Sequence, residues 1–178
     1  MPEDIELEEE KKPGLFKKIF LGVIALLLIF LIISRVGLGP EILHIFAGKL
    51  ASHELDENLS ITLKDGTEIV FNPGTYQELL EYHDRREGKE IKACLLGDKK
   101  DNEYLLNDIF FPEIIRNDVF SVTSAPCPDD TLVPLHSHPD NRCLYSSQDA
   151  KSHESFKKIN PDAISAVMCS KTRFGFYR

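Results

Sequence analysis

The feature that most constrains this chain is a run of apolar residues near its start. The stretch "LFKKIFLGVIALLLIFLIISRVGLGP" carries no charge between Lys18 and Arg35. As a helix, this uncharged run is roughly 24 Å long, slightly shorter than a hydrocarbon core of about 30 Å. Lys18 and Arg35 can reach the headgroups on either side. The sequence therefore predicts an acidic tail over residues 1–14 and a single transmembrane anchor over residues 15–39.

Two other interpretations of the apolar run fit less well. A signal peptide has a basic start and a small-residue cleavage site, whereas this chain starts with "MPEDIELEEE" and has no clear Ala-x-Ala after the run. A buried core helix is apolar on one face, and this run is apolar all round. A membrane anchor remains the better explanation.

The basic residues that flank the anchor predict its orientation. They are Lys11, Lys12, Lys17 and Lys18 before the run and Arg35 and Lys49 after it. Because the excess lies on the N-terminal side, the positive-inside rule favours a cytoplasmic N terminus and a domain outside the cytoplasm.

The rest of the chain divides into a connector and one domain. Gly39 and Pro40 end the anchor, and "EILHIFAGKLASHELDEN" is predicted to be an amphipathic connector over residues 40–57. In residues 58–178, "LSITLKDGTEIVF" predicts a β-hairpin with a two-residue Asp-Gly turn. The segment "GTYQELLEYHDRREG" predicts a helix, with Thr75 and Glu78 as a capping box and Gly88 as its stop.

Further strands and a second helix are predicted downstream. The strand-like runs are "EIKACLLG", "EYLLNDIFF", "VFSVTSA" and "TLVPLHS", followed by the helix "SSQDAKSHESFKKI" and the closing strands "AISAVMCS" and "FGFYR". A sheet with one early and one late helix indicates an α+β fold, arranged as three layers around a mixed sheet. The net charge of −8, with Lys and Arg interleaved among the acids, argues against a nucleic-acid partner.

The cysteines leave two alternatives open. Cys94, Cys127, Cys143 and Cys169 form no Cys-x-x-Cys pair, so neither a zinc finger nor a thioredoxin motif is present. In an oxidising compartment they can pair in three ways. In a reducing one they are expected to be small buried hydrophobic residues, which is the alternative that we favour from the sequence.

The segment "HSHPDNRCLYSSQD" carries the residues that suggest chemistry. If His136 and His138 end a strand, the period of two places both imidazoles on one side. Asp149, in the first turn of the next helix, can add an oxygen ligand for a metal ion. The alternative is a polar loop before a helix that Ser146 caps. His153 lies one turn beyond Asp149 and could join the site, although we expect it at the surface.

The combined spacing resembles the JAMM (MPN-domain) zinc metalloproteases. Their motif is His-x-His-Pro, seven intervening residues, then Ser-x-x-Asp, with a glutamate upstream at the start of a strand; here the glutamate of "EIKACLLG" is Glu90. Cys143 also matches some family members. The resemblance covers roughly residues 59–178, and it implies a cytidine-deaminase-like fold. The chain departs from the family pattern at Ala93, Leu135 and Tyr145, positions that concern substrate contacts and local packing more than the metal site.

The resemblance assigns a role to each site residue. It implies that His136, His138 and Asp149 bind zinc, with water as the fourth ligand. Glu90 would be the general base, and Ser146 would donate a hydrogen bond to the oxyanion. The family cleaves amide bonds after ubiquitin-like tails, and some prokaryotic members act on sulfur-carrier relatives.

We therefore expect a membrane-anchored metallopeptidase or isopeptidase that acts on a protein or peptide. A non-catalytic MPN scaffold that holds protein partners at the membrane is the alternative function, and a fortuitous motif in an unrelated domain is a third. The expected orientation conflicts with a cytosolic ubiquitin-like substrate. The sequence does not fix the oligomeric state.

Overall fold

The structure is a computed structural model that describes residues 14–35, 47–86, 88–118, 121–138 and 142–178. The predicted tail before residue 14 and the part of the anchor and connector over residues 36–46 lie outside the described residues. The chain divides into two compact units, Met1–Ile42 and Leu43–Arg178. Each is described by itself.

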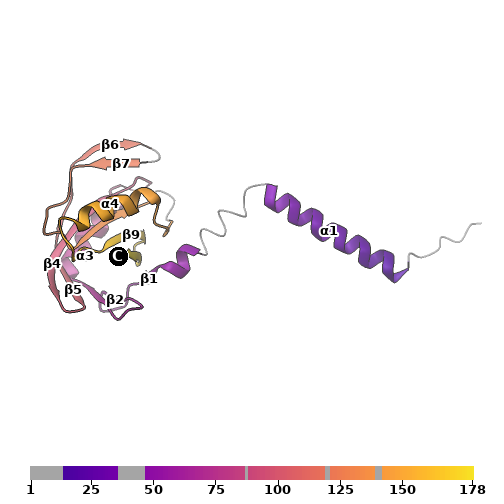
Figure 1. Cartoon of the computed structure of the whole chain (residues 1–178), viewed down its shortest axis with the longest axis horizontal. Helices are drawn as coiled ribbons and strands as arrows, with labels where there is room; N and C mark the ends of the chain where they lie inside the picture. The colour runs from indigo at the N-terminus through magenta and orange to yellow at the C-terminus, as the bar shows by residue number, and fades with distance from the viewer. Residues whose placement is uncertain (1–13, 36–46, 87, 119–120, 139–141) are drawn as a thin grey trace, which may run out of the picture. The chain divides into compact units, whose positions relative to one another are not determined.

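The first unit contains helix α1, Leu15–Arg35, drawn in indigo in Figure 1. Its stretch Leu15–Ser34 has a mean hydropathy of 2.6. A helix of this composition can span a membrane, belong to a signal sequence or form the core of a soluble domain. By length and composition, α1 can cross a membrane.

The second unit is built around one eight-stranded mixed sheet with the order β1-β10-β9-β8-β4-β5-β3-β2. The strands of this sheet are β1 (His53–Glu54), β2 (Ser60–Thr62), β3 (Glu68–Phe71), β4 (Lys92–Lys100), β5 (Glu103–Phe110), β8 (Val133–Ser137), β9 (Ser165–Ser170) and β10 (Arg173–Tyr177). The pairs β3–β5 and β8–β9 are parallel, and the other pairs are antiparallel. The predicted mixed sheet of an α+β fold is confirmed.

The start of the folded unit differs from its predicted boundary. Residues 47–51 form a helical turn, and β1 pairs with β10 through His53 and Phe174. Part of the predicted connector over residues 40–57 therefore belongs to the sheet. A separate hairpin of β6 (Ile114–Asp118) and β7 (Ser121–Ser124) lies outside the main sheet, and β6 was not predicted.

The first predicted hairpin is confirmed as β2–β3, but its turn is longer than expected. The amide of Leu63 donates to the carbonyl of Thr67, and the amide of Gly66 donates to the carbonyl of Leu63. Three residues therefore connect the strands instead of two. Gly66 has a φ of +84°, which is the left-handed conformation that closes a three-residue hairpin loop.

Helix α3, Pro73–Asp84, begins before the predicted capping box. Its N-cap is Asn72, whose side-chain oxygen accepts a hydrogen bond from the amide of Gly74, and Pro73 takes the first helical position. The prediction of Thr75 and Glu78 as a capping box is wrong, because Thr75 is already inside the helix and buried. Asn followed by Pro is the stronger start signal.

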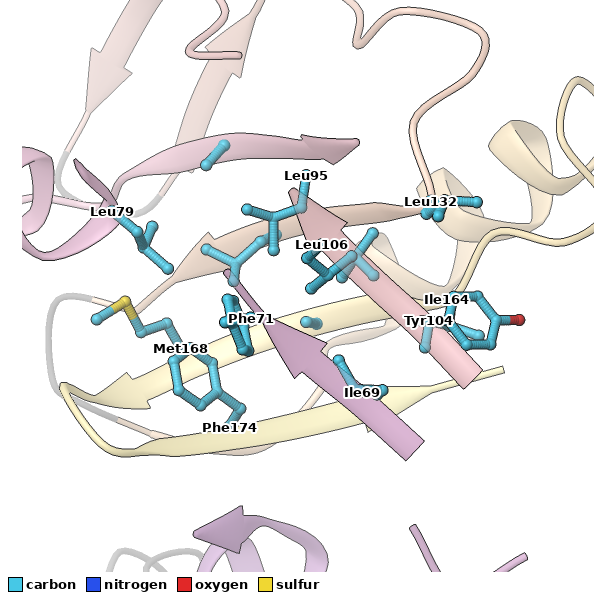
Figure 2. Close-up of a cluster of buried hydrophobic side chains, with 14 of the residues drawn as sticks. Ile69, Phe71, Leu79, Leu95, Tyr104, Leu106, Leu132, Ile164, Met168 and Phe174 are labelled. Atoms are coloured by element: carbon cyan, nitrogen blue, oxygen red, sulfur yellow. The ribbon is translucent and has the colours of Figure 1, made fainter. Parts of the chain in front are cut away.

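The two faces of the sheet have different contents. Along β4 and β8, the alternate residues Ala93, Leu95, Val133 and Leu135 belong to the main hydrophobic core, together with Leu79 of α3. Figure 2 shows part of this core, in which the Phe71 and Phe174 rings lie 5.5 Å apart. The intervening side chains point to the opposite face. We call these the core face and the polar face.

Along β4, β8 and β9, the residues between the core positions point to the polar face. They are Lys92, Cys94, Pro134, His136, Ser165, Val167 and Cys169. Helix α4, Ser147–Lys157, drawn in orange in Figure 1, brings Asp149 to this face. The sheet therefore separates α3 and the core from α4 and the polar groups.

All four cysteines are paired, as Cys94–Cys127 and Cys143–Cys169. Cys94 and Cys169 lie on the polar face of β4 and β9, and each is joined to a loop. The preference for four unpaired thiols is therefore wrong, because sequence spacing does not show which cysteines approach each other in space.

Candidate metal centre and cleft

Three of the predicted site residues come together where β8 meets α4. His136 lies on β8, His138 follows one residue after that strand ends, and Asp149 lies in the first turn of α4. One ligand atom from each of these residues lies within 4.8 Å of the other two. The structure thus brings together a group that could hold a metal ion. Pro139 of the sequence motif lies outside the described residues.

Each histidine has a ring nitrogen close to one oxygen of the Asp149 carboxylate. Nε2 of His136 lies 3.3 Å from Oδ1 of Asp149, and Nε2 of His138 lies 3.8 Å from Oδ2. Two ligand atoms about 2.0–2.1 Å from a tetrahedral ion are separated by about 3.4 Å. Nε2 of His136 is also buried and makes no hydrogen bond of acceptable geometry. In the neutral tautomer with its proton on Nδ1, this nitrogen can donate its lone pair to an ion, so the residues fit a metal.

A capping box at the start of α4 fixes the Asp149 carboxylate. The backbone amide of Ser146 donates to Oδ2 of Asp149 at 2.8 Å, and the amide of Asp149 donates to Oγ of Ser146 at 3.1 Å. Burial acts to raise the pKa of Asp149, but the contact with His136 and the hydrogen bonds from Ser146 outweigh it and hold the pKa well below the ordinary value. Asp149 is therefore a pre-oriented carboxylate that could serve as a metal ligand. The capped polar helix and the possible metal site share the same residues.

Glu90 is also part of this region. It precedes Ile91, whose amide donates to Oγ of Ser137 and whose carbonyl accepts from the amide of Ser137. These bonds place the start of β4 beside the end of β8. Burial raises the pKa of Glu90 and Asp149 adds to the rise, whereas the charges of His136 and Lys92 oppose it. A carboxyl group with a raised pKa is better suited to proton transfer near neutral pH.

Ser146 is placed for two roles at once. Its Oγ accepts the amide of Asp149, and the side chain is exposed at the cleft. A hydroxyl group has one donor and two acceptor positions, so accepting this bond leaves its proton free to donate elsewhere.

The cleft around these residues has a volume of about 570 Å³. Among the described residues it is lined by the possible ligand group, Glu90, Ser146 and further residues from β4, β8, β9, α4 and the segment before α4. They include two cationic residues, Lys92 on β4 and Arg142 before α4. Sequence reasoning missed both cations. The usable signal for Lys92 was its position two residues after Glu90, which places both side chains on one face of an extended chain.

The structure corrects the expectation for His153. This residue is only 6% exposed, instead of lying at the surface, and neither ring nitrogen has a hydrogen-bond partner among the described residues. Its ring lies 6.4 Å from the Tyr145 ring, which in turn stacks on Tyr177 at 4.1 Å. His153 is not part of the group of possible ligands. It packs behind the site.

Comparisons with known proteins do not assign the chain to a family. No protein-family model matches the sequence, and no curated protein matches it either.

Proposed function

We propose that this protein is a membrane-anchored, zinc-dependent peptidase or isopeptidase of the JAMM type, with the cytidine-deaminase-like fold of that family. The observation that carries the proposal is the ligand group of His136, His138 and Asp149 in one cleft with Glu90 and Ser146. Five separated sequence positions with complementary chemical roles line the same cleft.

The proposed roles follow from the chemistry of each side chain. His136, His138 and Asp149 would hold zinc, which, when bound, supplies a Lewis acid that makes water a nucleophile near neutral pH. Glu90 would take the proton from that water and return it to the leaving amine. The Ser146 hydroxyl would donate to the oxyanion that forms at the attacked carbonyl.

Two disulfides support a location for the domain outside the cytoplasm. Disulfides persist in oxidising compartments, and both Cys94–Cys127 and Cys143–Cys169 are formed in this structure. The excess of lysines before α1 favours the same orientation. The proposed substrate is therefore an extracytoplasmic protein or peptide. Protease protection in sealed vesicles tests this orientation, and ubiquitin-like tails become the better candidates if the domain faces the cytosol.

Zinc content and hydrolysis test the enzyme proposal. The full chain in detergent micelles should carry one zinc per chain and cleave members of a pool of linear and isopeptide-linked peptides, followed by mass spectrometry. Glu90→Gln should keep zinc and reduce kcat by about 10²–10⁴-fold. Glu78→Gln, at an exposed position on α3, is the matched control and should be as active as the wild type.

Ser146 needs a test that separates its two roles. Ser146→Ala should reduce kcat by about 10²–10³-fold and also remove the helix cap. Ser146→Thr keeps a hydroxyl group for both roles and should recover most of the activity. A chain without stoichiometric zinc would exclude the enzyme and favour the scaffold function. A zinc-bound chain whose hydrolysis does not depend on Glu90 would contradict the proposed mechanism.

A further inference from the structure

Lys92 has an unusual position for a lysine. Its Cα pairs with that of His136 across β4 and β8, so its side chain leaves the sheet on the polar face, toward the cleft that it lines. The residue is only partly exposed. Among the described residues its ammonium group has no carboxylate within ion-pair distance, although the charges of Glu90 and Asp149 act on it. A partly buried lysine is costly unless an anion balances it.

The other charged side chains that line the cleft bear on how the charge of Lys92 is balanced. Among the described residues, the charged side chains that line it are Lys92, Arg142, Glu90 and Asp149. A divalent ion bound by Asp149 would offset the negative charge of that carboxylate and leave less anionic charge to balance Lys92.

We propose that Lys92 is a specificity residue that binds a carboxylate of the substrate next to the bond that is cleaved. This inference rests on the proposed function. In that function Asp149 binds the metal ion, and Glu90 exchanges a proton with water and the leaving amine. Neither carboxylate is then a permanent partner for Lys92, and a substrate carboxylate supplies the missing anion. The carboxylate can be a free C terminus or an Asp or Glu side chain of the peptide.

Binding of matched peptides to the zinc-loaded full chain in detergent micelles tests this inference. Glu90→Gln is used as the background so that no peptide is cleaved. One pair is acetyl-Ala-Ala-Ala with a free carboxylate or with a terminal amide. The other is acetyl-Ala-Glu-Ala-amide against acetyl-Ala-Gln-Ala-amide. Titration calorimetry should show binding of one carboxylate peptide that is about 10-fold tighter than its neutral partner, and the responding pair identifies the source.

The variants separate Lys92 from the metal. In Lys92→Met the preference should fall below about twofold, and Lys92→Arg should retain it. Lys89→Met, an exposed position just before Glu90, changes the net charge equally and should leave the preference intact. A preference that survives in Lys92→Met would show that the carboxylate binds the ion alone and would overturn the inference. The inference would also be overturned if the Glu90→Gln chain that retains Lys92 showed no preference for the carboxylate peptides or no measurable binding.

The two proposals fail separately. If the wild-type chain shows zinc-dependent hydrolysis but both members of each peptide pair bind equally well, the enzyme proposal is supported and the role of Lys92 is contradicted. A Lys92-dependent preference in a chain that hydrolyses nothing removes the enzyme and leaves a carboxylate-binding site.

Discussion

The two faces of the sheet are made by the same strands but are held together by different means. On the core face, interlocking apolar side chains exclude water, and Phe71, Leu79 and Phe174 are almost fully buried. On the polar face, two disulfides, a capping box and the group around His136 take the place of such a core. A face that leaves room for a cleft cannot be close-packed, so covalent and polar links hold its loops in place. Apolar packing therefore stabilises the core face, whereas disulfides and polar links stabilise the face that carries the candidate site.

The largest test of this comparison removes a proposed ligand from the polar face. His138→Ala should reduce zinc from one per chain to near zero, because the two remaining side chains do not complete the ligand set. The free energy of unfolding of the metal-free protein should change little, since His138 is outside the core. Metal analysis and denaturant unfolding measure the two effects. His83→Ala on α3 is the control and should keep its zinc.

A truncation in the core face should have the opposite pattern. Phe174→Ala removes a fully buried ring and should lower the free energy of unfolding by about 3–5 kcal/mol. Zinc per folded chain should stay at one. Ile159→Ala, at a position that is 56% exposed, should change stability by less than about 0.5 kcal/mol. Loss of zinc at temperatures where Phe174→Ala is still folded would show that the faces are not independent.

The two disulfides allow a matched comparison within the polar face. Replacing either pair by serine should lower the free energy of unfolding by about 3 kcal/mol, because the sequence separations of 26 and 33 residues are similar. Only the Cys143–Cys169 replacement should also weaken zinc binding, since Cys143 lies in the loop that leads to Ser146. The carbonyl of Cys143 further accepts a hydrogen bond from the Tyr177 hydroxyl at 2.7 Å. Equal zinc affinity in both double variants would contradict this role for the loop.

The smallest expected effect concerns Tyr145, a half-buried residue that lines the cleft. Burial raises its pKa to about 12, from an ordinary value of 10.0. The buried neutral phenol therefore stabilises the fold below pH 10, and this contribution is lost as the pH rises through the folded pKa. Stability curves of the wild type and Tyr145→Phe should converge or cross between pH 10 and pH 12. A constant difference across this range would show that Tyr145 is not buried in its neutral form.

The local pattern predicted much of the fold because local forces decide much of it. Alternation in "LSITLKDGTEIVF" predicted a β-hairpin, and β2 pairs with β3 as expected. Ser146 and Asp149 predicted the start of α4 correctly, since a capping box is made by residues three apart. The failed capping box at Thr75 shows the limit. Two acceptable start signals occurred close together, and the Asn72–Pro73 pair begins the helix earlier.

The sequence by itself determined the apolar helix α1, most strands of the sheet and the types of residue available for a metal site, because each depends on neighbours along the chain. Only the tertiary structure decided which cysteines pair, that His153 is buried, and that Lys92 lies opposite His136. These features depend on which strands lie side by side. The pairing of β4 with β8 joins residues more than forty positions apart, such as Lys92 and His136, and no local propensity specifies contacts at that separation.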